Sequence, residues 1–251
     1  MSSVSTSSLL LTSRPHGESG AVIRFLTEKG LQAGYVQGAK SRHRRPLLLA
    51  GNQLQASWRN KAGYSLPSIQ IELLHSRASM ITDPLRALVL GWICPFTASI
   101  LPEAQPEPRI FSALNHLLNI TEKSIQPIVS LAELVRFELL LLSELGYGLS
   151  LSRCIFTGKS DNLTWVSPKH HAAVSQQVAQ GHEAKLLPLP QFLQKKRGHT
   201  EDHIPDWLAL QKGLRLSGFF LNRHFNSFYH RRLFSARDRL IRHITKFFIK
   251  A

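Results

Sequence analysis

The chain has 251 residues, 43% of them hydrophobic and 8% aromatic, which is ordinary for a globular protein and long enough for two domains. Its 31 lysine and arginine residues outnumber 16 acidic residues and give a net charge of +15 at pH 7. A surface this basic attracts polyanions, of which nucleic acid is the first candidate and an anionic membrane surface the second.

The cysteines and the apolar runs exclude several protein classes. Cys94 and Cys154 are the only cysteines and neither belongs to a CxxC pair, which rules out a four-cysteine zinc site and disfavours a disulfide scaffold. No apolar run approaches the roughly 18 residues that a membrane span needs. The N-terminal MSSVSTSSLLLT lacks a basic region and is too short in apolar residues for a signal peptide. We therefore expect a cytoplasmic protein that does not enter a membrane.

The first eighty residues read as short strands separated by turns. The clearest is 53–59, where Leu54, Ala56 and Trp58 alternate with polar residues and are expected to face a core. The last strand places Ile69, Ile71 and Leu73 inward by the same rule. The complete set of expected strands is 8–13, 21–27, 31–37, 53–59 and 68–74. This spacing predicts a small barrel, and strand count alone does not distinguish an OB-fold from an SH3-like barrel.

A basic loop lies between the third and fourth expected strands. We define it as residues 40–45, with the four cations Lys40, Arg42, Arg44 and Arg45. Most charge runs are merely solvated, but on a barrel of a very basic protein we favour contact with phosphates. Arg59 and Lys61 extend the same patch, and the nearby aromatic residues Trp58 and Tyr64 are candidates for stacking on bases, although the alternation favours a core position for Trp58.

From Asp83-Pro84 onward the apolar period becomes helical, so we place a domain boundary near residue 80. The central helix occupies the first half of residues 135–158 and is the most apolar, and Gly146-Tyr147-Gly148 ends it. After it we expect a strand or hairpin arm at 162–167 and a short helix from 187 to 193. The other expected helices are 84–101, 109–120, 206–225 and 233–248.

Motifs that carry chemistry are largely missing. Gly158-Lys159-Ser160 resembles the end of a phosphate-binding loop, but the required earlier glycine is Arg153. The pairs His170-His171 and His199-x3-His203 lack the partners of a metal site. Carboxylates are not clustered as a metal-dependent nuclease requires. We therefore predict a protein that is not an enzyme and that holds no metal.

Arg136 begins the most apolar part of the central helix, beside Phe137 and Leu140. One interpretation is an arginine whose stem lies along apolar surface while its head reaches water. The other is an arginine that fixes a carboxylate beside an apolar pocket, as in the capture of an acidic peptide or a chain end. The residues alone do not decide between them.

Several ordered motifs resemble the RecO family of bacterial recombination mediators. They are RPHGESGAVIRFLTEKGL (14–31), VQGAKS (36–41), RFELLLLSELGYG (136–148), LSRCIFTG (151–158), WVSP (165–168), LLPLPQFL (186–193) and, more loosely, GLRLSGFFLNRHF (213–225). The resemblance covers most of the chain. It implies an α+β protein with an OB-fold DNA-binding barrel at 1–80, an all-helical C-terminal domain at 81–251 and, since only Cys154 of the four-cysteine module of some relatives is present, no zinc module.

The resemblance also implies the function and the partners. The family binds single- and double-stranded DNA, anneals complementary strands and, with RecR, helps load RecA onto DNA coated by single-strand-binding protein (SSB), without a cofactor. It binds the acidic, apolar C-terminal tail of SSB in the helical domain, and the family arginine of the RFEL motif falls on Arg136, with Phe137 and Leu140 beside it. A nucleoid-associated protein is expected. The alternative is an RNA-binding or ribosome-associated OB-fold protein, which charge and fold class permit equally.

Overall fold

The computed structural model describes residues 5–59, 66–194, 204–226 and 231–250. The chain packs into two compact units: residues 1–122 together with 228–251, and residues 123–227. The first unit joins the barrel to three helices that lie beyond residue 80 in the sequence. The sequence-domain boundary near residue 80 remains a prediction, separate from this grouping by packing.

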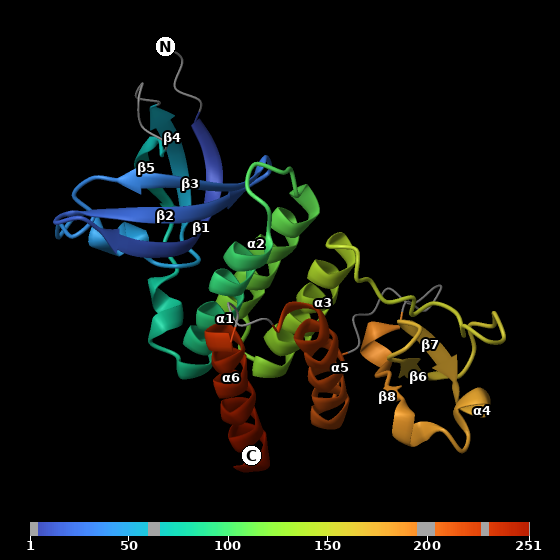
Figure 1. Cartoon of the computed structure of the whole chain (residues 1–251). Helices are drawn as coiled ribbons and strands as arrows, with labels where there is room; N and C mark the ends of the chain where they lie inside the picture. The colour runs from blue at the N-terminus through green and yellow to red at the C-terminus, as the bar shows by residue number, and fades with distance from the viewer. Residues whose placement is uncertain (1–4, 60–65, 195–203, 227–230, 251) are drawn as a thin grey trace. The chain divides into compact units, whose positions relative to one another are not determined.

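The first unit begins with a closed barrel of five strands (Figure 1). The strands are β1 (Ser5–His16), β2 (Gly20–Thr27), β3 (Gly30–Val36), β4 (Gln53–Arg59) and β5 (Ser68–His75). Strand β1 pairs antiparallel with both β2 and β4, and a parallel bridge between Tyr35 and Ser68 joins β3 to β5. The order β1-β2-β3-β5-β4 is that of an OB-fold, so the expected fold class is confirmed.

Alternating apolar residues fill the barrel as the sequence predicts, with one exception. Leu54, Ala56 and Ile69 are buried, and Ile71 packs against this core while partly exposed. Gly34 gives Ile69 its space, because a Cβ at that position would lie 2.0 Å from Ile69 Cδ1. The expectation for Leu73 is wrong: its side chain is 41% exposed, because the C-terminal half of β5 has left the core. The side chain of Trp58 lies outside the described residues.

Three long helices complete the first unit: α1 (Pro84–Ile100), α2 (Pro108–Lys123) and α6 (Arg231–Lys250). Asp83 caps α1 by accepting a hydrogen bond from the Arg86 backbone N–H at 3.0 Å. Helices α1 and α6 pack together, and Trp92 of α1 lies against Phe234 of α6 with ring centroids 5.8 Å apart. Two short 3-10 helices, η1 (Arg45–Leu48) and η2 (Ala78–Ile81), flank the last two strands.

The second unit is built on α3 (Pro127–Glu144) and α5 (Trp207–Phe225), which pack against each other. Gly213 allows a close approach, since a Cβ there would lie 2.7 Å from Phe192 Cζ and 3.3 Å from Val135 Cγ1. The buried carboxylate of Glu138 on α3 accepts a hydrogen bond from the Ser217 hydroxyl on α5. Gly146, with φ +85°, follows the end of α3 as the sequence predicts.

The second unit also contains a small sheet, so an all-helical C-terminal domain is too narrow a description. Its strands are β6 (Leu163–Ser167), β7 (Ala172–Ser175) and β8 (Leu187–Pro188), in the order β7-β6-β8. Strand β6 is the arm expected at 162–167. The helix expected at 187–193 is wrong in its first half, because Leu187 and Pro188 pair with β6 and only η4 (Gln191–Leu193) is helical. The remaining short elements are α4 (Gln176–Ala179) and η3 (Glu183–Lys185).

Within the described ranges, helices that combine the length and the apolar character of a membrane span are absent.

Candidate nucleic-acid and peptide-binding sites

The basic loop is a compact turn on the barrel between β3 and η1. The backbone N–H groups of Arg44 and Arg45 both donate to the Ser41 carbonyl, at 3.2 and 3.0 Å, and the Lys40 N–H donates to the Ser19 carbonyl at 3.2 Å. The side chain of Arg44 folds back and donates from Nη1 to the Gln37 carbonyl. The backbone bonds fix the turn, so its cations are carried by an ordered segment.

All four predicted cations of the loop are exposed. Within the described parts of the chain, no carboxylate forms an ion pair with Lys40, Arg42 or Arg45. A guanidinium or ammonium group without an acidic partner keeps its full charge for a phosphate. Arg44 donates one of its five N–H groups to the Gln37 carbonyl, and the other four can still bind a phosphate. The structure therefore gathers these four cations on one exposed turn.

The other barrel residues predicted to contact DNA are Arg59 and Lys61, with Tyr64 as a stacking candidate. Arg59 is the last residue of β4, and its side chain lies outside the described residues, as do Lys61 and Tyr64 entirely. The extension of the basic patch beyond β4 stays a prediction.

An apolar groove of about 790 Å³ lies beside the basic loop, and sequence reasoning missed it. Lys40 and Arg45 line it together with Leu48, Leu73 and Ile81. Leu73 and Ile81 are 41% and 50% exposed. The strict alternation along β5 pointed Leu73 into the barrel, so the sequence carried no signal for this surface.

Arg136 lies on α3 with its side chain along an aromatic surface, as the first interpretation of the sequence expects, and with a carboxylate beside it, as the second expects. Its side chain is 30% exposed and forms an ion pair with Glu133, one helical turn earlier. Its guanidinium carbon lies 5.6 Å from the centroid of the Phe192 ring, within the range of a cation–π contact. The group is thus held over an aromatic face with a carboxylate beside it. Phe137, by contrast, is only 3% exposed and belongs to the core, while Leu140 is half-buried.

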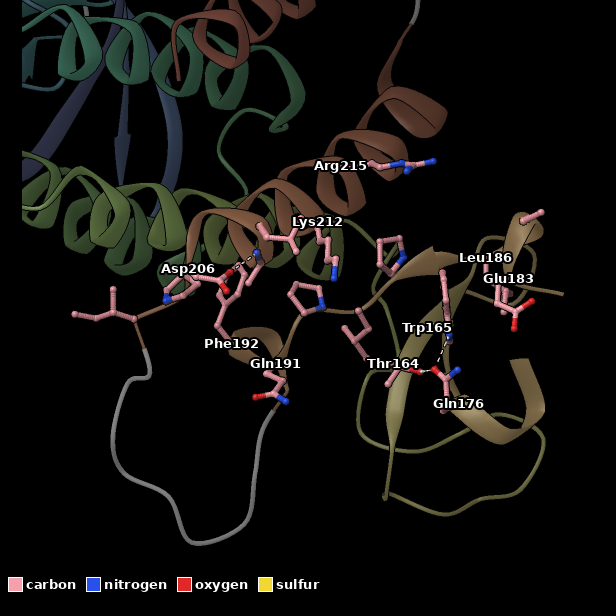
Figure 2. Close-up of a pocket in the computed structure, with 18 residues that line it drawn as sticks. Thr164, Trp165, Gln176, Glu183, Leu186, Gln191, Phe192, Asp206, Lys212 and Arg215 are labelled. Carbon is pink, nitrogen blue, oxygen red and sulfur yellow. Dashed lines mark hydrogen bonds between the residues drawn. The ribbon is translucent and has the colours of Figure 1, made fainter. Parts of the chain in front are cut away.

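Phe192 also lines a groove of the second unit, of about 1230 Å³ (Figure 2). Strands β6 and β8, η4 and the first half of α5 form its walls. Leu208 and Ile204 supply apolar side chains that are 56% and 50% exposed. Lys212 and Arg215 reach the groove from α5, while Trp165 and Gln176 form the opposite wall, where the Trp165 indole N–H donates to Gln176 Oε1 at 3.1 Å.

The groove carries charges of both signs: Asp206 and Glu183 line it together with the cations Lys212 and Arg215. Asp206 lies at the N-terminus of α5, where its carboxylate accepts the Ala209 backbone N–H at 2.7 Å. Lys212 and Arg215 follow at helical spacing on the same helix. An apolar trough with cations along one wall fits an extended peptide that carries both apolar and acidic side chains. The sequence singled out Arg136 but not Lys212, because cations on an amphipathic helix are common.

The histidines and cysteines do not form a metal site in the part of the chain that the structure describes, where no three His, Cys, Asp or Glu side chains meet. His171 lies 5.2 Å from His224, ring to ring, and burial lowers the pKa of both imidazoles, with Arg223 adding to the effect. The pair His199 and His203 falls outside the described residues.

Cys154 is buried and acts as a hydrogen-bond acceptor. Burial alone would raise the pKa of its thiol, but the Thr157 hydroxyl and the backbone N–H groups of Ser175, Phe156 and Thr157 lower it to about 6. The Ser175 N–H lies 3.4 Å from Cys154 Sγ. Hydrogen bonds from two segments of the chain therefore converge on this one sulfur.

Comparison with known proteins decides the family. The family model described as Recombination protein O N terminal matches residues 1–77, and Recombination protein O C terminal matches residues 81–233. The chain belongs to the RecO family. It is 39% identical over 240 residues to the DNA repair protein RecO of Gluconacetobacter diazotrophicus, an alignment that covers 93% of this chain and 91% of the relative.

Other RecO proteins are similar over most of their length. The DNA repair protein RecO of Methylorubrum extorquens is 37% identical over 221 residues (86% of this chain, 87% of the relative). That of Granulibacter bethesdensis is 36% identical over 231 residues (91% and 90%). Membership of the RecO family assigns the chain a role in DNA repair and recombination, with DNA as the implied partner. It also confirms the resemblance that the sequence motifs indicated.

Proposed function

We propose that this chain is a recombination mediator that binds single- and double-stranded DNA, anneals complementary strands and, with RecR, helps load RecA onto single-stranded DNA coated by SSB. The observation that carries the proposal is the exposed basic loop on an OB-fold barrel, in a chain with a net charge of +15. An OB-fold with cations along its loops is a common platform for single-stranded nucleic acid. Annealing and loading are binding reactions, so the proposal requires no catalytic group and no cofactor.

The second part of the proposal is that the second unit binds the acidic, apolar C-terminal tail of SSB. Arg136 supplies a cation over the Phe192 ring. Phe192 also lines the apolar groove that contains Lys212 and Arg215. A tail of that chemistry can place apolar side chains against Leu208 and Phe192 and carboxylates near the cations. Phe137 supports this site from the core, and Leu140 lies at its half-buried edge.

The ion pair between Arg136 and Glu133 gives a direct test of the tail site. Because an acidic peptide must compete with Glu133 for the guanidinium, Glu133→Gln should tighten the binding of a tail peptide, whereas Arg136→Ala should weaken it by about tenfold or more, the effect of losing a charged hydrogen bond. Lys212→Ala and Arg215→Ala should weaken it through the same charges. The measurement is fluorescence anisotropy of a labelled peptide with the sequence of the cognate SSB tail.

The outcome separates the site from general electrostatics. A peptide of the same length and charge with its apolar residues changed to serine is the control, and it should bind weakly to every variant. Wild-type affinity of Arg136→Ala for the tail peptide would remove Arg136 from the site. A preference of the wild-type protein for structured RNA over single-stranded DNA at matched salt would instead favour the RNA-binding function.

A further inference from the structure

A buried amide, that of Asn52, links helix η1 at the end of the basic loop to the segment that enters β4. Asn52 is fully buried, immediately before β4, and its side chain forms three hydrogen bonds. Nδ2 donates to the carbonyls of Pro46 and Leu47, both at 3.1 Å, and Oδ1 accepts the Arg77 backbone N–H at 2.9 Å. Pro46 and Leu47 belong to η1, which begins at Arg45, the last cation of the loop.

The Asn52 amide supplies the side-chain hydrogen bonds to the carbonyls of η1. No side chain caps the N-terminus of η1 with a hydrogen bond. Asn52 instead binds two of its carbonyls, and the backbone of Asn52 is itself fixed to the barrel, since its carbonyl accepts the Leu10 N–H at 2.9 Å. Asn52 therefore holds η1 against the barrel together with the apolar side chain of Leu48, which packs on the barrel core.

Arg77 holds Asn52 from the other side. Its side chain is fully buried and donates to the Gly51 carbonyl at 2.8 Å, to Glu122 at 3.0 Å and to the side-chain oxygens of Asn115 and Asn119 at 3.1 and 2.9 Å. This network joins the entry of β4 to helix α2. Buried polar networks of this kind, when fully satisfied, rigidify the segments that they join.

We propose that Asn52 is a positioning residue for DNA binding: through η1 it fixes the loop 40–45 in the conformation that presents Lys40, Arg42 and Arg45 to phosphates. This inference rests on the proposed function of the loop. Preorganised contacts bind more tightly because the ordering cost is already met in the free protein. Loss of the Asn52 amide should thus weaken DNA binding without changing the charge of the protein.

The test is a double-mutant cycle on the full chain, with a labelled dT oligonucleotide at one fixed salt concentration. Asn52→Ala should raise the dissociation constant by at least about threefold, in the range of coupling between contacting residues. In the Arg42→Ala/Arg45→Ala background the same substitution should change it less than about twofold, because two of the three cations that Asn52 is proposed to position have been removed. Gln53→Ala is the matched control: it is the next residue along the chain, and it removes a side-chain hydrogen bond to Ser7 of β1 at 3.0 Å instead of the bonds to η1.

Each outcome has a separate meaning. If Arg42→Ala/Arg45→Ala binds DNA like the wild type, the proposed function of the loop fails. If that variant weakens binding but Asn52→Ala has no effect, or an equal effect in both backgrounds, the positioning role is overturned. Asn52→Ser, which keeps an acceptor for Arg77, enters the same cycle if the alanine variant does not fold.

Hydrogen exchange on the wild-type protein supplies a measurement that needs no variant. A positioned loop predicts slow exchange of the Arg44, Arg45 and Leu47 amides in the free protein, each of which donates to a backbone carbonyl. Exchange of these amides at the rate of an unstructured chain, beside protected barrel amides, would contradict the proposal.

Discussion

Replacing Arg42, Arg44 and Arg45 with alanine should weaken DNA binding and flatten its dependence on salt. Each phosphate contact on single-stranded DNA contributes about 0.7 to the slope of log K against log salt. Arg42 and Arg45 carry charged groups without an acidic partner among the described residues, and Arg44 has one N–H bound to the Gln37 carbonyl. Two to three lost contacts would therefore lower the slope by about 1.4 to 2.1.

That change in slope is large enough to measure. Between 50 and 200 mM salt, the wild type should lose roughly 7- to 20-fold more affinity than the triple variant. The assay is anisotropy of a labelled dT oligonucleotide over a salt series. The control variant replaces Arg239, Arg242 and Lys246, three exposed cations of α6, with alanine, so that the loss of net charge is equal.

The control decides whether location or net charge matters. A triple loop variant with the same slope as the α6 control would show that the loop does not contact phosphates. Equal slopes for the loop variant and the wild type would refute the reasoning altogether.

Two further predictions follow from buried polar groups. Arg77→Met should lower the free energy of unfolding by about 3–5 kcal/mol, because it leaves the Glu122 carboxylate and the Asn115 and Asn119 side chains without their buried partner. Urea unfolding measures this loss, and a loss below about 1 kcal/mol would contradict the prediction. The ultraviolet absorbance of a thiolate should rise near pH 6 as Cys154 ionises, since burial raises the pKa of Cys94 to about 12 and keeps that thiol protonated in this range. Cys94→Ser should keep the step and Cys154→Ser should lose it.

The lowered pKa of Cys154 also sets the sign of a stability change. Between pH 6 and about 8.5, the ordinary pKa of a thiol, the unfolded chain binds a proton that the folded chain has released. Stability should therefore rise with pH over this window and fall as pH drops toward 6. In Cys154→Ser, urea unfolding at pH 6 and pH 8.5 should differ less than in the wild type; an identical difference would contradict the assignment.

The barrel could be predicted from the sequence because its signals are local. Alternation fixed the bounds of β4 at Gln53 and Arg59, and glycine and proline marked the turns. Leu73 shows the limit: alternation predicts which residues share a face of a strand, but whether that face is covered depends on neighbours that the pattern does not include. The parallel contact of Tyr35 with Ser68 that closes the barrel is equally non-local.

The candidate sites divide in the same way. A run of cations and a family motif identified the basic loop and Arg136, since both are continuous in sequence. Arg77 was not identified, because its role comes from contacts with segments 25 residues or more away. Asn52 was not identified either: its bonds to Pro46 and Leu47 are close in sequence, but a single asparagine in a loop gives no signal that its amide is buried. The groove beside Phe192 likewise combines a short strand, a 3-10 helix and α5, so no stretch of sequence contains it.

Strand annealing is the measurement that tests the central claim most directly. Two complementary labelled oligonucleotides, each coated with the cognate SSB, are mixed with and without this protein, in the absence of nucleotide and metal. A mediator that acts on DNA and SSB together should accelerate annealing, and Arg136→Ala should lose the acceleration on SSB-coated strands while keeping it on bare strands. No acceleration of either kind, with DNA binding intact, would contradict the proposed function.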